Sequence, residues 1–351
     1  MIILIIVHRF HTNLFYPVKS LIEYGNQVIL IVPKIDIYDK LIEDHSFIEP
    51  IRISNRDLSI CFIRDLLKQI VPDLIIQRYF HKKWKLFSII GRFMGIQCVT
   101  YDQSPQTYNN LLAQLSRPIQ RVIKGQPLRK FTPTLNKGIP GKFKEPFSKF
   151  IPFPIEPLVD INIRTYCPDR TIRFLCVGKL GQKRKHHLLL LDALEKINVN
   201  CSLTFAGAGP DYALADIEYF NLLEKRCYSS SLKGEIKIIM DLPYQEMIKI
   251  YSKHDILVMP AENESHGQCI VEALAAGCPV VTTDDCGAAG YITDGYNGLI
   301  FKKNDLNGLI EKLNIFLENP TKISEFGHNA IQQIIEQHSP ESFVKDILDL
   351  I

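Results

Sequence analysis

Two glutamates, Glu264 and Glu272, stand eight residues apart in ILVMPAENESHGQCIVEALAAGCPVVTT, residues 256–283. The apolar runs at both ends of this segment are typical of buried parallel strands. Cys269–Ala276 between them is typical of a helix that Gly277 ends. Glu264 is therefore expected just before a helix, and Glu272 about a turn and a half inside it.

The start of this helix favours ligand binding. Ser265 and Gln268 fit the S-x-x-Q capping box, and Gly267 lets a ligand approach the backbone closely. Free amides at a helix N-terminus can bind an anion. A solvated loop position for Glu264 and a surface position for Glu272 are the alternative. However, the ALAAG that follows Glu272 is the least polar part of the helix.

A second cluster is basic. The apolar strand 172–177 is followed by Gly178-Lys179-Leu180 and then by Lys183-Arg184-Lys185-His186-His187. Cations at the carboxyl end of a parallel strand suit phosphate groups, although several of these side chains can equally be solvated. Gly207-Ala-Gly209 lacks the third glycine of a dinucleotide fingerprint, so it favours a tight turn whose backbone lines a nucleotide base.

The segment around the two glutamates resembles the donor-binding signature of the retaining nucleotide-sugar glycosyltransferases of family 4. Glu264 and Glu272 match the E-x7-E motif, and the similarity continues through Gly277-Cys-Pro279 to Asp294-Gly295-Tyr-Asn297-Gly298. The resemblance covers residues 171–300 well and residues 1–150 only in architecture.

The basic loop carries the same resemblance. Gly178-Lys179 and the later Lys185 match a Gly-Arg pair and a lysine that clasp the donor diphosphate in this family. Lys179 replaces the usual arginine and offers a point charge in place of a bidentate fork. His186 stands where the family pattern has glycine.

The resemblance implies transfer of a sugar from a nucleotide diphosphate to an acceptor hydroxyl, with retained configuration. In this account Glu264 holds the transferred sugar and acts in catalysis with Lys179 and Lys185, which stabilise charge on the leaving diphosphate. Glu272 accepts hydrogen bonds from the ribose. The donor site further includes Gly267, Gln268, His266, Gly178 and Gly207. A UDP-sugar is the expected donor, and the fixed cations make a metal or other cofactor unnecessary. Retention by a single or a double displacement stays open.

Composition agrees with a two-domain α/β protein. A chain of 351 residues is too long for one ordinary core. We expect a GT-B fold with a cleft between two Rossmann-like domains: residues 1–155 for the acceptor and 171–335 for the nucleotide sugar, with 336–351 as a helix returning to the first domain. The four prolines of 150–170 mark the connection.

Nine cysteines without a C-x-x-C pair indicate reduced core thiols in a cytoplasmic protein, and a structural zinc site is not expected. The apolar N-terminal run ends after seven residues at His8-Arg9, so it predicts a buried strand and no secretion signal. No stretch approaches the ~20 apolar residues of a membrane span.

The first half departs from the family in two loops. His8–Asn13 replaces a glycine-rich turn, and Tyr101 takes the place of a histidine near the donor sugar. Tyr101, Asp102 and His11 are candidate acceptor residues, with ordinary loop roles as the alternative.

Between residues 117 and 150 nine cations accompany four phenylalanines. This surface suits the anionic inner face of a membrane, and a solvated face with a linker is the other interpretation. The net charge of +3 does not point to nucleic acid.

The expected function is a glycosyltransferase of surface polysaccharide, lipopolysaccharide or glycolipid synthesis, with a glycan or lipid-linked acceptor. A non-catalytic nucleotide-sugar-binding protein derived from a transferase is one alternative, because the glycine and histidine features are missing. An NAD-dependent oxidoreductase or epimerase is the other. It would need a complete glycine fingerprint, which neither the turn after Val7 nor the turn after Ala206 supplies.

Overall fold

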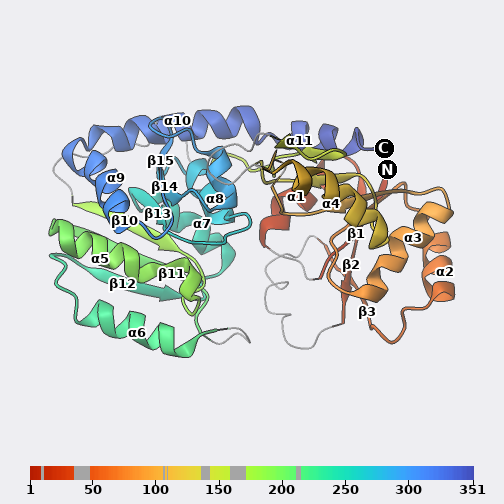
Figure 1. Ribbon diagram of the computed structural model, residues 1–351, viewed down its shortest axis with the longest axis horizontal. Helices are drawn as coiled ribbons and strands as arrows, with labels where there is room; N and C mark the ends of the chain where they lie inside the picture. The colour runs from red at the N-terminus through yellow and green to blue at the C-terminus, as the bar shows by residue number, and fades with distance from the viewer. Residues whose placement is uncertain are drawn as a thin grey trace. The chain divides into compact units, whose positions relative to one another are not determined.

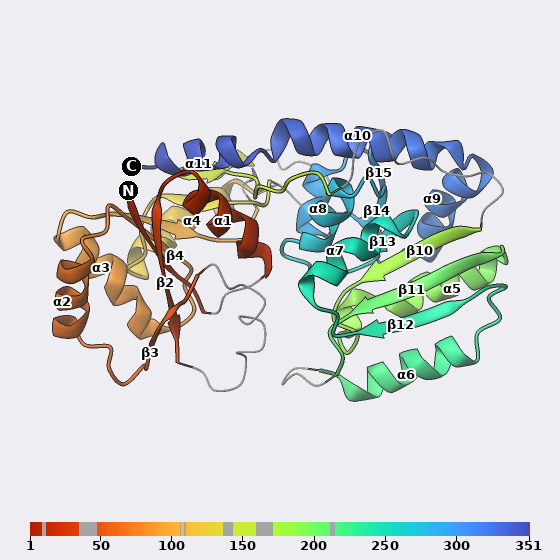
Figure 2. The ribbon, with the colours of Figure 1, turned by 180° about the vertical axis from the view of Figure 1, so that it is seen from behind.

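The computed structural model describes residues 1–8, 12–34, 48–105, 107–108, 110–135, 143–158, 171–210 and 215–351. These residues form two compact units, shown in Figure 1 and from the opposite side in Figure 2. The first unit comprises the described parts of 1–135, 143–154 and 338–351, and the second comprises those of 155–337. Each unit is built on one parallel β-sheet flanked by helices.

The sheet of the first unit has the strand order β3-β2-β1-β4-β5-β7-β9, and neighbouring strands are parallel. The strands are β1 (Ile2–Ile6), β2 (Gln27–Pro33), β3 (Ile51–Ile53), β4 (Leu74–Gln77), β5 (Gln97–Tyr101), β7 (Lys130–Thr132) and β9 (Ser148–Phe150). The helices are η1 (Thr12–Leu14), α1 (Phe15–Glu23), α2 (Ile60–Ile70), η3 (Lys82–Lys85), α3 (Leu86–Phe93), α4 (Leu111–Ile123) and α11 (Pro340–Leu348). A short antiparallel pair is formed by β6 (Thr107–Tyr108) and β8 (Phe143–Lys144).

The central strand β1 shows why this sheet forms. Successive side chains of a strand point to opposite faces. Ile3 and Ile5 therefore pack in one core with residues of α1 and α11, whereas Leu4 and Ile6 pack in another with residues of α2 and α3. A strand buried on both faces must be apolar throughout, as the run at the N-terminus is.

The sheet of the second unit has the order β12-β11-β10-β13-β14-β15 and is also parallel. The strands are β10 (Ile172–Val177), β11 (Cys201–Gly207), β12 (Ile236–Met240), β13 (Ile256–Met259), β14 (Val280–Thr283) and β15 (Gly298–Phe301). The helices are η4 (Lys183–Lys185), α5 (His187–Ile197), α6 (Ile217–Tyr228), α7 (Tyr244–Ser252), α8 (Gln268–Ala275), η5 (Gly287–Tyr291), α9 (Leu306–Glu318) and α10 (Thr321–Gln337).

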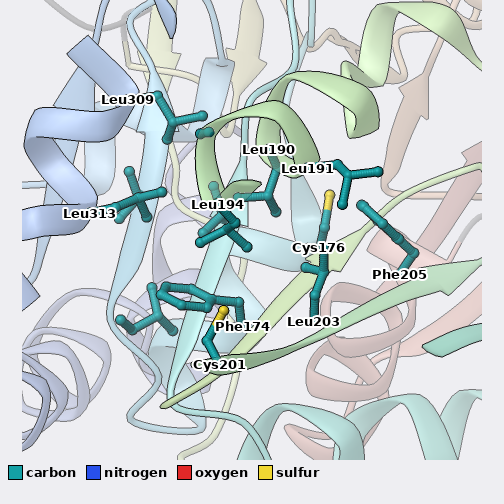
Figure 3. Close-up of a cluster of buried hydrophobic side chains, with 14 of the residues drawn as sticks. Phe174, Cys176, Leu190, Leu191, Leu194, Cys201, Leu203, Phe205, Leu309 and Leu313 are labelled. Carbon is teal, nitrogen blue, oxygen red and sulfur yellow. The ribbon is translucent and has the colours of Figure 1, made fainter. Parts of the chain in front are cut away.

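The core of this unit lies between the sheet and helices α5 and α9. In Figure 3, Leu190, Leu191 and Leu194 of α5 point toward side chains of β10 and β11, among them Phe174 and Leu203. All these side chains are fully buried. The leucine repeat of α5 thus fixes the helix that follows the cationic loop.

The predicted strand 172–177 and the predicted helix Cys269–Ala276 are present within one residue as β10 and α8. Helix α6 begins at Ile217 because the Asp216 side chain caps it by accepting a hydrogen bond from the Tyr219 amide at 2.9 Å. Helix α4 was not predicted. Its start is capped in the same way by Asn110, which accepts from the amide of Leu112 at 2.8 Å.

The two C-terminal helices part at Ser339-Pro340. Ser339 caps α11 and Pro340 occupies its first turn. Helix α10 belongs to the second unit, whereas Phe343, Val344 and Ile347 of α11 pack in the core of the first. Figures 1 and 2 both show α11 beside α1. Within the described residues, no helix combines the length and hydrophobicity that crossing a membrane requires.

Candidate functional site

The sheet of the second unit reverses its winding between β10 and β13. Ligands of doubly wound sheets bind at such a switch point, outside the carboxyl ends of the strands. The loop after β10 carries η4, and the loop after β13 carries Glu264. The basic and the acidic clusters identified in the sequence therefore share one edge of the sheet.

Glu264 accepts hydrogen bonds from two cations of the other loop. Its Oε2 lies 2.6 Å from Nζ of Lys185 and 2.9 Å from Nη1 of Arg184. The Glu264 and Lys185 side chains are 11% and 10% exposed, whereas Arg184 is 40% exposed. The amide of Glu262 donates to the carbonyl of Arg184 at 2.9 Å, so the backbone also joins the two loops. We call Glu264, Arg184 and Lys185 the ion cluster.

The ion cluster carries excess positive charge. Burial raises the pKa of Glu264, but the charges and hydrogen bonds of Lys185 and Arg184 outweigh burial and lower this pKa to about 2. The carboxylate is therefore ionised at neutral pH and offsets one of the two cations. The remaining positive charge is available to an anionic ligand.

Two glycines, Gly178 and Gly207, allow close packing between the basic loop after β10 and the end of β11. A Cβ on Gly178 would lie 3.1 Å from Cδ of Lys185, so the lysine stem runs along the glycine. A Cβ on Gly207 would lie 1.8 Å from the carbonyl oxygen of Gly178, which no side chain could tolerate. His186 has a left-handed backbone with φ +52°, the conformation that glycine adopts with least strain.

Helix α8 begins at Gln268, and its N-cap is Gly267 with φ +85°. The capping box predicted from Ser265 and Gln268 is wrong, because no side chain caps this terminus. The left-handed turn at Gly267 starts the helix three residues after Glu264. His266 is 3% exposed, and its Nε2 lies 3.2 Å from Oε1 of Gln268.

Glu272 is buried on α8 and faces two tyrosines of α7. Its carboxylate accepts hydrogen bonds from the hydroxyl of Tyr251 at 2.7 Å and that of Tyr244 at 3.2 Å. Burial raises the pKa of Glu272 to about 7, although hydrogen bonds from Tyr251, Tyr244 and Gln268 oppose the rise. Near neutral pH this carboxyl group can therefore exchange a proton.

The remaining predicted donor residue, Lys179, follows β10 and is half-buried. Its carbonyl accepts from the amide of Gln182 at 3.2 Å in the turn that precedes η4. The structure thus gathers all predicted donor-site residues at one edge of the second sheet, on the loops after β10, β11 and β13 and on α8.

Three residues at this site were not predicted: Arg184, Tyr244 and Tyr251. Arg184 stands in the predicted basic loop, and its position beside Lys185 was the available signal. The tyrosines are 28 and 21 residues from Glu272, and only the packing of α7 on α8 brings them to it.

The Asp294–Gly298 motif has a structural role. Asn297 is fully buried, its Oδ1 accepts from the amide of Thr293 at 2.8 Å, and its Nδ2 donates to the carbonyl of Tyr291 at 3.1 Å. Nδ2 also donates to Gln333 of α10. The motif therefore joins the turn before β15 to α10.

The candidate acceptor residues lie in the first unit, apart from His11, which is outside the described residues. Tyr101 is 1% exposed, stacks on Phe131 and accepts from Nε2 of Gln103 at 2.9 Å. Asp102 accepts from the amide and hydroxyl of Ser104 at 3.0 and 2.6 Å. Burial opposes the ionisation of Asp102, but the charge of Lys130 and these bonds lower its pKa.

The basic segment 117–149 is not one continuous surface. Arg121 and Lys130 are buried around Glu145, whose Oε2 lies 2.7 Å from Nζ of Lys130. Lys149 pairs with Asp346 of α11 at 2.9 Å. The exposed cations are Arg117, Lys124, Arg129 and Lys144, and two further lysines, Lys137 and Lys142, lie outside the described residues.

The sequence model of the family Glycosyl transferases group 1 matches residues 166–333. An uncharacterized glycosyltransferase of Methanocaldococcus jannaschii is 28% identical over 142 residues, which are 40% of this chain and 37% of that protein. A D-inositol 3-phosphate glycosyltransferase of Corynebacterium urealyticum is 26% identical over 178 residues, or 50% of this chain and 41% of that protein. The chain thus spans less than half the length of these two relatives.

Among solved structures, Anabaena HepE in complex with UDP and glucose has a TM-score of 0.72 at 14% identity, covering 99% of this chain and 98% of that one. This likeness extends over both units and confirms the predicted fold class. Residues 166–333 are thus similar to the glycosyl transferases group 1 family, within a chain whose two parallel-sheet units have the GT-B fold.

Proposed function

We propose that the chain transfers a sugar from a nucleotide-diphosphate sugar to an acceptor hydroxyl with retention, as the family 4 glycosyltransferases do. The observation that carries this proposal is the ion cluster at the switch point, with Glu272 on the helix that follows. Excess positive charge next to a helix N-terminus suits a diphosphate. The HepE structure contains UDP and glucose, which supports a UDP-sugar donor.

In the proposed step the bond between the sugar C1 and the diphosphate oxygen breaks, and the nucleoside diphosphate leaves with the electron pair. Lys185, Arg184 and Lys179 stabilise the charge that grows on it. The acceptor oxygen bonds to C1 from the same face, and its proton passes to the departing phosphate. We favour this single displacement because two cations engage Glu264, which makes its carboxylate a poor nucleophile. Glu264 then positions the transferred sugar, and Glu272 positions the ribose of the nucleotide.

We propose that turnover requires no divalent metal, because Lys185 and Arg184 supply fixed positive charge where a metal would otherwise act. Activity is expected to persist in EDTA. Loss of turnover in EDTA with recovery in Mg²⁺ or Mn²⁺ would contradict this part of the proposal.

The test of the proposed function is nucleoside diphosphate release from UDP-, GDP- and ADP-sugars by the wild-type protein. We expect slow release from one donor class in water and faster release with a hydroxyl acceptor. Binding of nucleotide sugars without any release would instead identify a non-catalytic binding protein. Products analysed by NMR would show the configuration at C1, and an inverted linkage would contradict the mechanism.

We propose further that the protein is cytoplasmic and binds anionic bilayers through α4, consistent with glycolipid, lipopolysaccharide or surface polysaccharide synthesis. This helix turns its apolar face outward: Leu112, Ile119 and Ile123 are 76%, 61% and 78% exposed. A helix in a soluble protein normally buries this face. Lys144 of β8, a strand that contacts α4, is exposed as well, which suits anionic lipid headgroups.

The membrane proposal is tested by co-sedimentation with vesicles of phosphatidylcholine with and without phosphatidylglycerol. We expect binding that needs the anionic lipid, weakens in salt and falls at least tenfold in Ile119→Ser/Ile123→Ser, because burial of such a side chain contributes ~1.5–3 kcal/mol. The control Ile217→Ser/Tyr228→Ser removes exposed apolar side chains of α6. Equal loss in both variants, or dimer formation through α4, would contradict the proposal.

A further inference from the structure

The first unit contains a basic cavity that the donor site does not use. It has a volume of about 320 Å³ and lies at the carboxyl ends of β4 and β5, beneath α4. Four cationic side chains line it, Arg78, Arg117, Arg121 and Lys124, against one carboxylate, Asp102. In a parallel sheet this edge is where ligands bind.

The fold concentrates the cations there. Arg117, Arg121 and Lys124 are four and three residues apart, so they share one face of α4. This face is opposite the exposed apolar face and points to the cavity. Arg78 follows β4 directly and approaches the cavity from the sheet.

Two of these arginines are held in place before any ligand arrives. Arg78 donates through Nη2 to Oε1 of Gln103 at 3.1 Å, and its guanidinium lies 5.6 Å from the ring centre of Tyr101. Arg121 is fixed by Glu145 and by the carbonyl of Leu128 at 2.9 Å. Preorganised guanidinium groups lose little conformational entropy on binding an anion.

The cavity also holds unused hydrogen-bonding capacity. Thr100 and Arg121 line it and are only 4% and 7% exposed. Within the described parts of the chain, Oγ1 of Thr100 and Nε of Arg121 are buried without a hydrogen-bond partner. Buried polar atoms are normally satisfied, so both groups suit a bound ligand.

We infer that this cavity binds a phosphate group of the acceptor, so that the acceptor is a phosphorylated alcohol. The inference rests on the proposed function and adds the chemical class of its second substrate. Phosphate has the charge and the acceptor oxygens that the four cations and Thr100 require. Asp102 lies among these cations and can accept a hydrogen bond from an acceptor hydroxyl.

The test is calorimetric titration of inorganic pyrophosphate into the protein saturated with UDP, which fills the donor site. We expect one binding event that is at least tenfold weaker in Arg117→Gln/Lys124→Gln. Both side chains are exposed, so the fold should persist, and an unfolding curve checks this. If the double variant unfolds, Lys124→Gln alone replaces it. The control Arg56→Gln/Lys68→Gln removes the same charge from exposed positions outside the cavity.

Two further binding measurements identify the source of the phosphate. Glycerol 3-phosphate represents a free ester, and phosphatidic acid in phosphatidylcholine vesicles represents a lipid-borne one. The inference holds if the cavity variant binds pyrophosphate and one of these two ligands more weakly than wild type. It is overturned if wild type binds no pyrophosphate, if the cavity variant binds it normally, or if the control variant loses as much. The titration needs no turnover, so it can succeed or fail independently of the proposed transfer reaction.

Discussion

The two glutamates of the donor site have the same chemistry and opposite environments. Glu264 is buried beside two cations and stays ionised, whereas Glu272 is buried beside neutral tyrosine hydroxyls and has a pKa of about 7. The spacing in the sequence brings both to one loop and helix. It cannot say which carboxylate is paired, because Arg184, Lys185 and Tyr251 come from other elements.

The raised pKa of Glu272 predicts a pH-dependent stability. Its folded pKa of about 7 exceeds the ordinary value of 4.5, so its contribution to stability is lost as pH rises from about 4.5 to 7. Glu272→Gln keeps a hydrogen-bond acceptor and removes the ionisation. We therefore expect the free energy of unfolding of the variant, relative to that of wild type, to rise by up to ~3 kcal/mol between pH 5 and pH 8.

Denaturant unfolding of both proteins at these two pH values measures this difference. If the free energies of unfolding of wild type and Glu272→Gln change with pH in parallel, the assigned environment of Glu272 is wrong. The lowered pKa of Glu264 acts at lower pH, because its contribution is lost only as pH falls from 4.5 toward 2. The two effects are thus separable.

Among the elements, the apolar runs at the N-terminus, at 172–177 and at both ends of 256–283 were enough to predict buried strands of both parallel sheets. The same reasoning missed α4, because its apolar side chains face outward and its cations line a cavity. Such a pattern looks like a basic loop until the neighbouring elements are known. The start of α8 was also misassigned, because a left-handed glycine replaced the predicted serine cap.

Gly267 starts α8 with a left-handed turn. Substitution of this glycine measures the free energy that a side chain costs at this position. A Cβ there would lie 2.8 Å from Sγ of Cys286, whereas a Cβ on Gly295, which has a similar φ of +83°, would meet no atom within 4 Å. Gly295→Ala should cost ~1–2 kcal/mol from backbone strain alone, and Gly267→Ala should cost more.

Chemical denaturation of the two variants gives the comparison. Adding Cys286→Ala to Gly267→Ala removes the close sulfur and should recover the excess cost. Equal costs for the two single variants would contradict the close approach at Gly267.

At the scale of the whole molecule, the chain returns to its first unit at the end. The buried ring of His338 lies 2.7 Å from the carbonyl of Phe153, and burial lowers its pKa to about 4, so it is neutral at physiological pH. Helix α11 then adds Phe343, Val344 and Ile347 to the first core. Residues 336–351 were expected to form a helix that returns to the first domain, and the resemblance alone suggested this return.

Removal of residues 338–351 should therefore destabilise the first unit and leave the core of the second intact. We expect limited proteolysis to cleave the truncated chain within residues 1–154 first, while a fragment containing 171–337 persists. The full-length chain is the control. Faster cleavage of the second unit than of the first would contradict this division.

We propose that the ion cluster stabilises the donor diphosphate in the transition state. Steady-state sugar transfer is measured for Lys185→Ala and for the neighbouring Lys183→Ala, whose side chain is exposed and outside the ion cluster. We expect Lys185→Ala to lower kcat about 30- to 1000-fold, corresponding to ~2–4 kcal/mol, whereas Lys183→Ala stays within about twofold of wild type. Equal kcat values for the two variants, or a loss confined to KM, would contradict this proposal.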